Sequence, residues 1–355
     1  MRLLHVTATH LSLVGGIPVV LRDLVTEQNK IEGFTARVLS IKACVNNMES
    51  DYFDLLGTQS FSEYLQNYMP DIVIFHSHYY FEYIALYKEL VRRTIPYYIE
   101  PHGSFGSAAL NKSKWKKKIA NNLLLYRFMK NAKGFIFLNK SEKEDSRFRT
   151  SNDIIIPNGI SGEVASYLKK DRKVKFYFIG RFDIEHKGLD ILFDALRLLE
   201  EKKLDYVVDF YGSGTDEQEC YINNKINEFS CLQVKNKGPI YGKTKETELE
   251  QCGIMLLTSR YEGFPMTSLE AWKYGNPCIV TKGTNIQDEV VENHLGWATS
   301  LNATEIANVI VKAANEYKEQ SEKYINGCKQ YVVSNYKWAY IAEQSYQILK
   351  QKIER

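Results

Sequence analysis

Residues 254–274 read Ile254-Met-Leu-Leu-Thr-Ser-Arg-Tyr-Glu-Gly-Phe-Pro-Met-Thr-Ser-Leu-Glu-Ala-Trp-Lys-Tyr274. The apolar run that begins this stretch predicts a buried strand, and Gly263 and Pro265 predict a turn after it. From Thr267 onward the pattern is helical. A strand, a turn and a helix in this order expose a helix N-terminus at the carboxyl edge of a parallel sheet, which is where open α/β folds bind ligands.

Two glutamates stand eight residues apart in this stretch. Glu262 falls in the turn and Glu270 one turn into the helix, so both carboxylates are expected to face one small crevice. Carboxylate oxygens accept hydrogen bonds from vicinal hydroxyls, and the backbone N–H groups beside them suit phosphate. A ligand with both kinds of group is a sugar nucleotide. The alternative is that both acids only complement the helix dipole, and the local pattern leaves both interpretations open.

Apolar runs of strand length alternate with helical patterns along the chain. Near-continuous apolar strands separated by helices predict a parallel sheet that is covered on both faces. The expected strands are Leu3–Ala8, Ala36–Ile41, Ile72–Phe75, Tyr97–Ile99, Gly134–Leu138, Val174–Gly180, Tyr206–Tyr211, Leu232–Val234, Ile254–Leu257 and Cys278–Thr281. The pattern restarts after residue 173, so we predict an α/β fold with two copies of one doubly wound architecture.

The length of 355 residues exceeds one ordinary core and fits two domains. The segment Ile156-Pro-Asn-Gly-Ile160 and the polar stretch after it predict the linker between them. We therefore expect an N-terminal domain over residues 1–158, a second domain over residues 172–335, and a terminal helix over residues 336–355.

The composition is that of a soluble globular protein. Hydrophobic residues make up 44% of the chain, charged residues make up 25%, and the net charge is +3. No run approaches ~20 apolar residues, so nothing is expected to span a membrane. The six cysteines show no CxxC spacing, which favours reduced thiols in a cytoplasmic protein. The first residues turn polar too early for a signal peptide and predict a core strand instead.

The stretch 260–271 resembles the E-x7-E signature of the retaining glycosyltransferases called family 4. The resemblance covers most of the chain and implies the GT-B architecture, in which two Rossmann-like domains with doubly wound parallel sheets face a central cleft. In that architecture the terminal helix usually crosses back to the first domain. The resemblance also implies that Glu262 contacts hydroxyls of the donor sugar and that Glu270 grips the ribose of the nucleotide.

The residues between the two glutamates are implied to turn backbone N–H groups toward the sugar and the diphosphate. These donor-binding residues are Gly263, Phe264, Pro265, Met266 and Thr267. Pro265 lacks an N–H group, so this chain offers one donor fewer there than a glycine would.

Two cations lie in the segment Gly180-Arg-Phe-Asp-Ile-Glu-His-Lys-Gly-Leu189, which closes the first strand of the second series. Arg181 and Lys187 are expected over a helix start, where fixed cations stabilise the charge that a leaving diphosphate accumulates. The matching pair of the family implies that both hold the diphosphate. The alternative is two solvated surface charges, because lone Arg and Lys side chains are mostly exposed.

The resemblance assigns two further places in the first domain. Gly15 and Gly16 follow the first strand, and the matching glycines of the family face the donor diphosphate. His102, in Pro101-His-Gly-Ser104, matches a histidine that hydrogen-bonds a hydroxyl of the donor sugar. The alternatives are an ordinary turn for the glycines and a histidine satisfied within its own turn for His102.

Neither a metal nor a cofactor is expected beside the nucleotide-sugar substrate. No Asp-x-Asp occurs, whereas glycosyltransferases of the other major fold use that motif to hold a divalent ion on the diphosphate. His76 and His78 have a spacing that could suggest a metal, but no further ligands cluster with them in the sequence. No G-x-G-x-x-G fingerprint follows the first strand, which disfavours an NAD(P) oxidoreductase.

A basic segment over residues 112–130 predicts contact with an anionic membrane surface. Five lysines stand within Lys112–Lys118, and Trp115 is followed by apolar residues at helical spacing. The alternative is a solvated helix face above an ordinary core stripe. Nucleic acid is disfavoured as a partner, because no RNA- or DNA-binding motif accompanies the basic residues.

The sequence therefore predicts a retaining, metal-independent glycosyltransferase that moves a hexose-type sugar from a nucleotide-sugar donor to an acceptor hydroxyl. By resemblance, the donor is UDP-linked and lies mostly on the second domain. The acceptor is expected to be a lipid-linked glycan of surface polysaccharide synthesis, used in the cytoplasm at the inner face of the cell membrane. The alternatives are a GT-B nucleotide-sugar epimerase and a non-catalytic two-domain protein that binds sugar.

Overall fold

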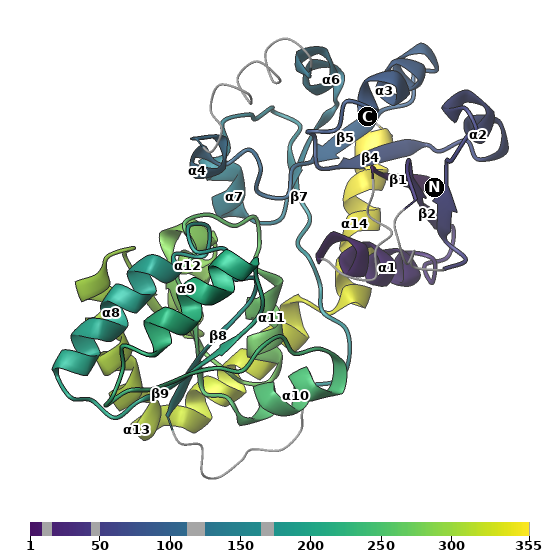
Figure 1. Ribbon diagram of the computed structural model, residues 1–355. Helices are drawn as coiled ribbons and strands as arrows, with labels where there is room; N and C mark the ends of the chain where they lie inside the picture. The colour runs from purple at the N-terminus through teal and green to yellow at the C-terminus, as the bar shows by residue number, and fades with distance from the viewer. Residues whose placement is uncertain (9–15, 44–49, 112–124, 165–173, 355) are drawn as a thin grey trace. The chain divides into compact units, whose positions relative to one another are not determined.

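The computed structural model describes residues 1–8, 16–43, 50–111, 125–164 and 174–354. The chain divides into two compact units (Figure 1). Unit 1 comprises Met1–Ser161 and Tyr336–Arg355, and unit 2 comprises Gly162–Asn335. The terminal segment 336–355 thus belongs to the same unit as the first strands. Within the described residues, no helix is both long and apolar enough to cross a membrane.

Unit 1 is built on a parallel sheet with the strand order β3-β2-β1-β4-β5-β6-β7. Its strands are β1 (Arg2–Thr7), β2 (Thr35–Ser40), β3 (Phe53–Leu55), β4 (Ile72–His76), β5 (Tyr97–Glu100), β6 (Gly134–Phe137) and β7 (Ile154–Ile155). Its helices are α1 (Gly16–Gln28), α2 (Phe61–Asn67), α3 (Tyr83–Arg92), α4 (Ser107–Asn111), α6 (Tyr126–Asn131), α7 (Lys140–Asp145) and α14 (Trp338–Ile353). The sequence predicts the five longer strands to within one residue at each end, whereas the short strands β3 and β7 carry too little pattern to be recognised.

Unit 2 is built on a second parallel sheet, in the order β10-β9-β8-β11-β12-β13. Its strands are β8 (Lys175–Ile179), β9 (Val207–Tyr211), β10 (Gln233–Asn236), β11 (Ile254–Leu257), β12 (Cys278–Thr281) and β13 (Gly296–Thr299). Its helices are α8 (Leu189–Glu201), α9 (Asp216–Ile226), α10 (Gly242–Gln251), α11 (Met266–Lys273), α12 (Gln287–Glu292) and α13 (Ala303–Asn335). Counted within the unit, this is the 3-2-1-4-5-6 order of the doubly wound fold. The first six strands of the unit 1 sheet follow the same order.

Each sheet presents a different set of residues to its two faces, because side chains alternate along a strand. In unit 1, Leu4, Val6 and Phe75 pack into an apolar core with residues of α2, α3 and α6. His5 and His76 stand at the intervening positions of β1 and β4 and are buried on the other face. In unit 2, the core lies between the sheet, α8 and α13. One face of the first sheet is therefore apolar and the other contains buried polar groups.

Helix α14 packs against α1 within unit 1 (Figure 1). The ring of Tyr346 lies 5.0 Å from the ring of Phe34, and the backbone N–H of Ile160 donates to the carbonyl of Tyr336 at 2.7 Å. Trp338 is buried against Gly159, where a side chain would overlap the indole. These contacts attach the C-terminal helix to the sheet on which the chain begins.

Gly188 precedes α8 and has a backbone φ of 64°, a left-handed conformation that favours glycine. A Cβ atom at this position would overlap the carbonyl oxygen of Thr258, just after β11. Two loops of unit 2 therefore touch at a point where only glycine fits.

We expect Gly188→Ala to lower the free energy of unfolding by roughly 2 to 5 kcal/mol, because it adds overlap to left-handed backbone strain. Gly238→Ala is the matched control: Gly238 has a φ of 71°, but nothing lies within 4 Å of its Cβ position. The control should lose only about 1 to 2 kcal/mol. Urea denaturation of both variants checks this, and equal losses would contradict the proposed contact.

Candidate active site

The loops after β8 and β11 form the candidate site of unit 2. The two strands are hydrogen-bonded neighbours although they are not consecutive. They mark the place where the strand order reverses, which is where doubly wound sheets bind ligands. Residues 180–188 leave β8 and residues 258–265 leave β11 at the same carboxyl edge. The sequence-predicted cations and the first glutamate therefore emerge on adjacent loops.

Backbone and side-chain hydrogen bonds hold these two loops together. The hydroxyl of Thr258 donates to the carbonyl of Lys187 at 3.0 Å, and the N–H of Arg260 donates to the carbonyl of His186 at 2.9 Å. The guanidinium of Arg260 binds both carboxylate oxygens of Asp190 at 2.8 and 2.7 Å. This bidentate pair raises the pKa of Arg260, so Arg260 fastens the loop to the start of α8.

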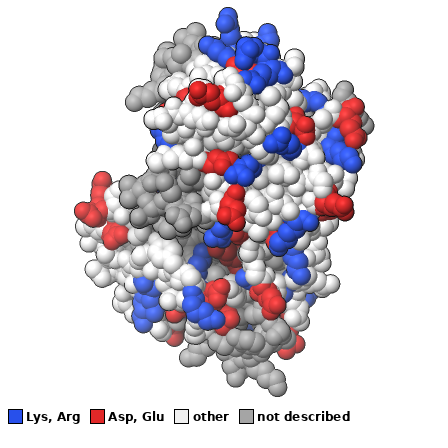
Figure 2. Space-filling model, turned by 90° about the vertical axis from the view of Figure 1, so that its right-hand side faces the viewer, with Lys and Arg blue, Asp and Glu red and all other residues white. Residues whose placement is uncertain are grey.

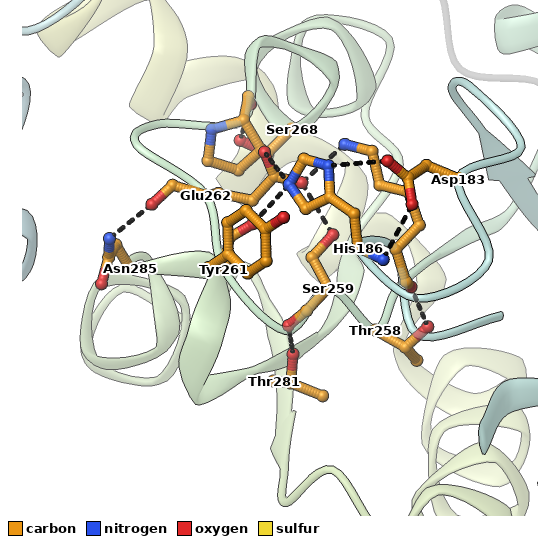
Figure 3. Close-up of polar contacts among 11 residues, drawn as sticks. Asp183, His186, Thr258, Ser259, Tyr261, Glu262, Ser268, Thr281 and Asn285 are labelled. Carbon is orange, nitrogen blue, oxygen red and sulfur yellow. Dashed lines mark hydrogen bonds and ion pairs between the residues drawn. The ribbon is translucent and has the colours of Figure 1, made fainter. Parts of the chain in front are cut away.

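Lys187 and Glu262 form an ion pair between the two loops, and Figure 3 shows Glu262 with its second donor, Ser259. Nζ of Lys187 lies 2.6 Å from Oε1 of Glu262, and the hydroxyl of Ser259 donates to the same oxygen at 2.7 Å. The lysine and glutamate side chains are only 15% and 12% exposed. Oε2 of Glu262 lies 3.9 Å from Nε2 of His186, which is too far for a hydrogen bond. One carboxylate oxygen is thus held by two donors and the other is not.

His186 supports the turn that carries Glu262. Its Nε2 donates to the carbonyl of Tyr261 at 2.7 Å, and its ring stacks on that of Tyr261 at 4.2 Å. Burial lowers the pKa of His186, so the ring is neutral at pH 7 and has one proton to donate. The side-chain amide of Asn285 donates to the carbonyl of Glu262 at 2.6 Å. These contacts fix the backbone of the turn, so the Glu262 carboxylate is not needed to hold the turn in place.

Arg181 is exposed just after β8, and among the residues that the structure describes it takes part in no ion pair. The structure places it on the same loop as Lys187, between β8 and α8. Lys187 is already paired and Arg181 is the exposed cation of the loop, a difference that the sequence does not show.

The predicted donor-binding stretch runs from the turn into the first residues of α11. Phe264 is buried and anchors the turn, and Pro265 is the N-cap residue of the helix. The N–H and the hydroxyl of Ser268 both approach the carbonyl of Pro265, at 2.9 and 2.7 Å. Gly263, Met266 and Thr267 are partly exposed. Because the first N–H groups of a helix have no partner inside it, this end of α11 can bind an anion.

Glu270 is paired with a lysine that the sequence did not single out. Nζ of Lys245, in the first turn of α10, lies 2.7 Å from each carboxylate oxygen of Glu270. Lys245 stands in a polar helix between other charged residues, so no pattern distinguishes it. Both glutamates of the signature therefore have a lysine partner in the structure.

In unit 1, the structure places His102 directly after β5 with a backbone φ of 49°. Nε2 of His102 lies 3.0 Å from Nδ1 of His76, and its Nδ1 lies 3.4 Å from Oε1 of Glu100. Both ring nitrogens thus face buried partners of the same unit. Gly16 is the first residue of α1. Gly15 and residues 112–124 of the basic segment lie outside the described residues.

The expectation that no further ligands cluster with His76 is wrong. Glu100 and His102 lie against it, and one ligand atom from each of the three residues falls within 4.8 Å of the others. Glu100 is the register partner of His76 on the neighbouring strand, so the cluster arises from sheet pairing and not from sequence spacing. His78 turns elsewhere, with Nδ1 at 3.0 Å from the hydroxyl of Ser104.

A second buried carboxylate fixes the loop after β5. Glu142 accepts hydrogen bonds from the N–H groups of Gly103 and Leu138, each at 2.6 Å. Burial raises the pKa of Glu142 to about 7, and burial together with Glu142 raises the pKa of Glu100 well above its usual range. The loop that contains His102 is therefore held from two sides by acidic side chains.

Residues 162–354 match the family described as glycosyl transferases group 1, and residues 14–163 match glycosyltransferase family 4. The chain belongs to the glycosyl transferases group 1. It is a glycosyltransferase with the GT-B architecture, as the two parallel-sheet units and the structural neighbours show.

Curated relatives cover different shares of the chain. A lipopolysaccharide 1,6-galactosyltransferase of Escherichia coli is 25% identical over 68% of this chain and 67% of its own length. The alpha-1,3/1,6-mannosyltransferase ALG2 of Candida glabrata is 25% identical over 40% of this chain. The chain spans only about a third of the length of that relative, at 32%.

Solved structures share the fold over nearly the whole chain. Sucrose-phosphate synthase from Thermosynechococcus elongatus superposes with a TM-score of 0.76 at 16% identity, covering all of both chains. Anabaena HepE in complex with UDP gives a TM-score of 0.72 at 15% identity. The lipopolysaccharide outer core galactosyltransferase WaaB gives 0.72 at 17% identity. HepE and WaaB each match over 99% of this chain and 100% of their own.

We expect Lys187→Met to lower the free energy of unfolding by about 1 to 3 kcal/mol, because it leaves a mostly buried carboxylate without its cation. Lys245→Met removes a more exposed partner and should lose about 1 kcal/mol or less. Lys243→Met, on the same helix with its side chain 91% exposed, is the control and should lose almost nothing.

The double variant Lys187→Met with Glu262→Gln should regain most of the lost stability, because a neutral amide does not need the cation. Urea denaturation of the wild type, the two single variants Lys187→Met and Glu262→Gln, and the double variant measures the effects. If the double variant is as unstable as the sum of its single changes, the two side chains are not coupled.

Proposed function

We propose that the protein is a retaining glycosyltransferase that transfers a hexose from a UDP-linked donor to a hydroxyl of a lipid-linked glycan. Unit 2 holds the donor and unit 1 contributes the acceptor side. One observation carries the donor assignment: two carboxylates, each paired with a lysine, lie beside the N-terminus of α11 at the switch point of the sheet. Hydroxyl acceptors, phosphate-binding cations and helix amides are the groups that a nucleotide sugar needs.

The comparisons support the nature of the donor and acceptor. HepE is a structural neighbour with UDP, and it is also known with UDP-glucose. Lipopolysaccharide galactosyltransferases stand among both the curated relatives and the structural neighbours. Acidic and basic side chains are interspersed over most of the face shown in Figure 2, and basic side chains gather at its top. Docking to an anionic membrane through residues 112–130 stays a prediction.

In the proposed reaction, the bond between the anomeric carbon and the diphosphate breaks, and the bond to the acceptor oxygen forms on the same face of the sugar. Negative charge gathers on the leaving UDP, where Arg181 and Lys187 stabilise it. The amides at the start of α11 add fixed dipoles for the same charge. A phosphate oxygen of the donor takes the acceptor proton. Glu262 holds sugar hydroxyls, and Glu270 accepts from the ribose. No step calls for a metal.

Calorimetry with UDP-hexoses and GDP-hexoses should show micromolar binding of one UDP-hexose that is unchanged by EDTA. Glu270→Ala should weaken this binding by about 10- to 100-fold, because it removes an acceptor for ribose hydroxyls. Glu246→Ala, at an exposed position on α10, is the control. Failure of every nucleotide sugar to bind would refute the donor assignment, and loss of binding in EDTA would refute metal independence.

Glu262→Ala and Lys187→Ala should each abolish transfer, by a factor of roughly 1,000 or more, while circular dichroism shows an intact fold. Arg197→Ala, in an exposed pair with Glu228, should leave turnover unchanged. NMR of the product should show the anomeric configuration of the donor retained. Near-normal turnover in either site variant contradicts the assignment, and conversion of the nucleotide sugar without an acceptor would identify an epimerase instead.

A further inference from the structure

A line of buried polar side chains crosses unit 1 on the face of the sheet that carries α1 and α14. His5 is the register partner of Ile74, and His76 is the register partner of Glu100, so the two histidines and Glu100 point to the same face. Five side chains follow one another in hydrogen-bond contact. They form the polar line, which consists of Ser345, Gln28, His5, His76 and His102.

The polar line begins on the C-terminal helix. The hydroxyl of Ser345 donates to the carbonyl of Ala342 at 2.7 Å. Nε2 of Gln28, at the end of α1, donates to the hydroxyl oxygen of Ser345 at 3.2 Å. Oε1 of Gln28 lies 3.2 Å from Nε2 of His5. Both ends of the Gln28 amide are thereby engaged.

Three imidazoles continue the polar line toward the loop after β5. Nδ1 of His5 lies 2.8 Å from Nε2 of His76, and Nδ1 of His76 lies 3.0 Å from Nε2 of His102. Successive ring centroids are 5.1 and 5.3 Å apart. Each ring presents Nε2 to one neighbour and Nδ1 to the other or to Glu100.

The hydrogen bond of Ser345, at one end of the polar line, determines which group donates in each of the following hydrogen bonds. A backbone carbonyl can only accept, so the proton of Ser345 points to Ala342 and its oxygen accepts from the amide of Gln28. The amide oxygen of Gln28 then accepts from Nε2–H of His5. Burial lowers the pKa of His5 to about 4, so its Nδ1 has no proton at pH 7 and accepts from Nε2–H of His76. A neutral His76 accepts in turn from Nε2–H of His102.

We propose that the polar line holds the ring of His102 in a single orientation, neutral and with its proton on Nε2, and that His5, His76 and Gln28 are positioning residues for it. Glu100 completes the arrangement at Nδ1 of His102. The tautomer assignment stands on unit 1 alone. Its consequence for transfer rests on the proposed function, in which His102 belongs to the active site.

Glu100 fits this assignment. Its two oxygens lie 3.4 Å from Nδ1 of His102 and 3.3 Å from Nδ1 of His76. Burial and the neighbouring Glu142 raise the pKa of Glu100 well above its usual range, which favours the protonated carboxyl, and in that form its proton faces Nδ1 of His102 at 3.4 Å. Nε2 of His102 then donates to His76 and Nδ1 faces Glu100, so neither ring nitrogen is left to act as the base that takes the acceptor proton.

The same cluster of His76, Glu100 and His102 has the residue types of a metal site, but the distances favour hydrogen bonding. Two nitrogens that bind one tetrahedral zinc ion lie about 3.3 Å apart. The 3.0 Å between Nδ1 of His76 and Nε2 of His102 is a direct hydrogen bond with the proton between the two atoms.

NMR of the ring nitrogens tests the assignment directly. The chain has seven histidines, so long-range proton–nitrogen spectra of protein labelled at histidine can be resolved at pH 7.5. We expect His5, His76 and His102 to be neutral with the proton on Nε2. A proton on Nδ1 of any of the three, or a charged His76, would overturn the proposal. So would zinc that copurifies at one ion per chain, or added zinc that removes the His102 Nε2–H signal.

Variants of Gln28 separate a positioning role from local packing. Gln28→Met keeps the volume but removes the acceptor, so His5 should move to the Nδ1–H tautomer, and the signals of His76 and His102 should change with it. Ser345→Ala frees the amide of Gln28 to rotate and should cause a smaller change in the same direction. Gln66→Met, at an exposed position of α2, should change none of the three. A change confined to His5 would contradict the proposal.

The transfer assay gives a separate result. Gln28→Met should lower kcat by roughly 10-fold with little change in the KM for the donor, because the variant misplaces a group that acts on the bound substrate. An unchanged kcat together with altered His102 signals would confirm the polar line and remove His102 from the active site. Absence of transfer in the wild-type protein with intact signals would count against the proposed function alone.

Discussion

The site of unit 2 depends on the close contact between Gly188 and the backbone carbonyl of Thr258. The left-handed turn at Gly188 allows the loop after β8 to lie directly on the loop after β11. When the two loops are in contact, the carbonyl of Lys187 accepts from the hydroxyl of Thr258, and the Lys187 side chain reaches Glu262 at 2.6 Å. A backbone contact between two loops thus sets the position of both charges.

The two units use the same strand order for different chemistry. In unit 2 the charged groups stand on the loops after β8 and β11 and on the helices α10 and α11. They are partly exposed there, so ligand hydroxyls and phosphates can replace their present partners. In unit 1 the polar groups lie on the sheet itself, on the face opposite the apolar core. Such groups are costly to bury unless each finds a partner, and the polar line provides these partners in sequence. The site of unit 2 can therefore exchange contacts, whereas the arrangement in unit 1 is fixed.

Sequence reasoning succeeded where the determining pattern is local. The sequence predicts the strands β11 and β12 with the bounds that the structure shows, because each is a short and mostly apolar run. The strand β13 was missed, since Gly296-Trp-Ala-Thr299 has no apolar run. The sequence misses the partner of Glu270 for another reason: Lys245 is 25 residues away and reaches it through tertiary packing.

His76 shows the same limit in unit 1. The sequence places it beside His78, two residues away, yet its partners are Glu100 on the neighbouring strand β5, His102 in the loop after that strand, and His5 on the other neighbouring strand, β1. Pairing of strands in a parallel sheet brings together positions that are far apart in the chain, such as His5 and His76, which are 71 residues apart. A single sequence contains no signal for that distance. The candidate histidine could be named from its motif, but the side chains that orient it required the sheet.

The lysine pairs bear on how the proposed donor could bind. Each signature glutamate would otherwise present a negative charge to a diphosphate, which would repel it. In the structure, Lys187 and Lys245 neutralise the two carboxylates, and Arg181 adds an exposed cation on the same loop as Lys187. A donor that brings phosphates and hydroxyls together can take the lysine protons on its phosphates and give its hydroxyl protons to the glutamates. Each charged group then exchanges one partner for another and always keeps one. A sugar without phosphates offers no partner to the lysines, and a nucleotide without a donor sugar offers no partner to Glu262.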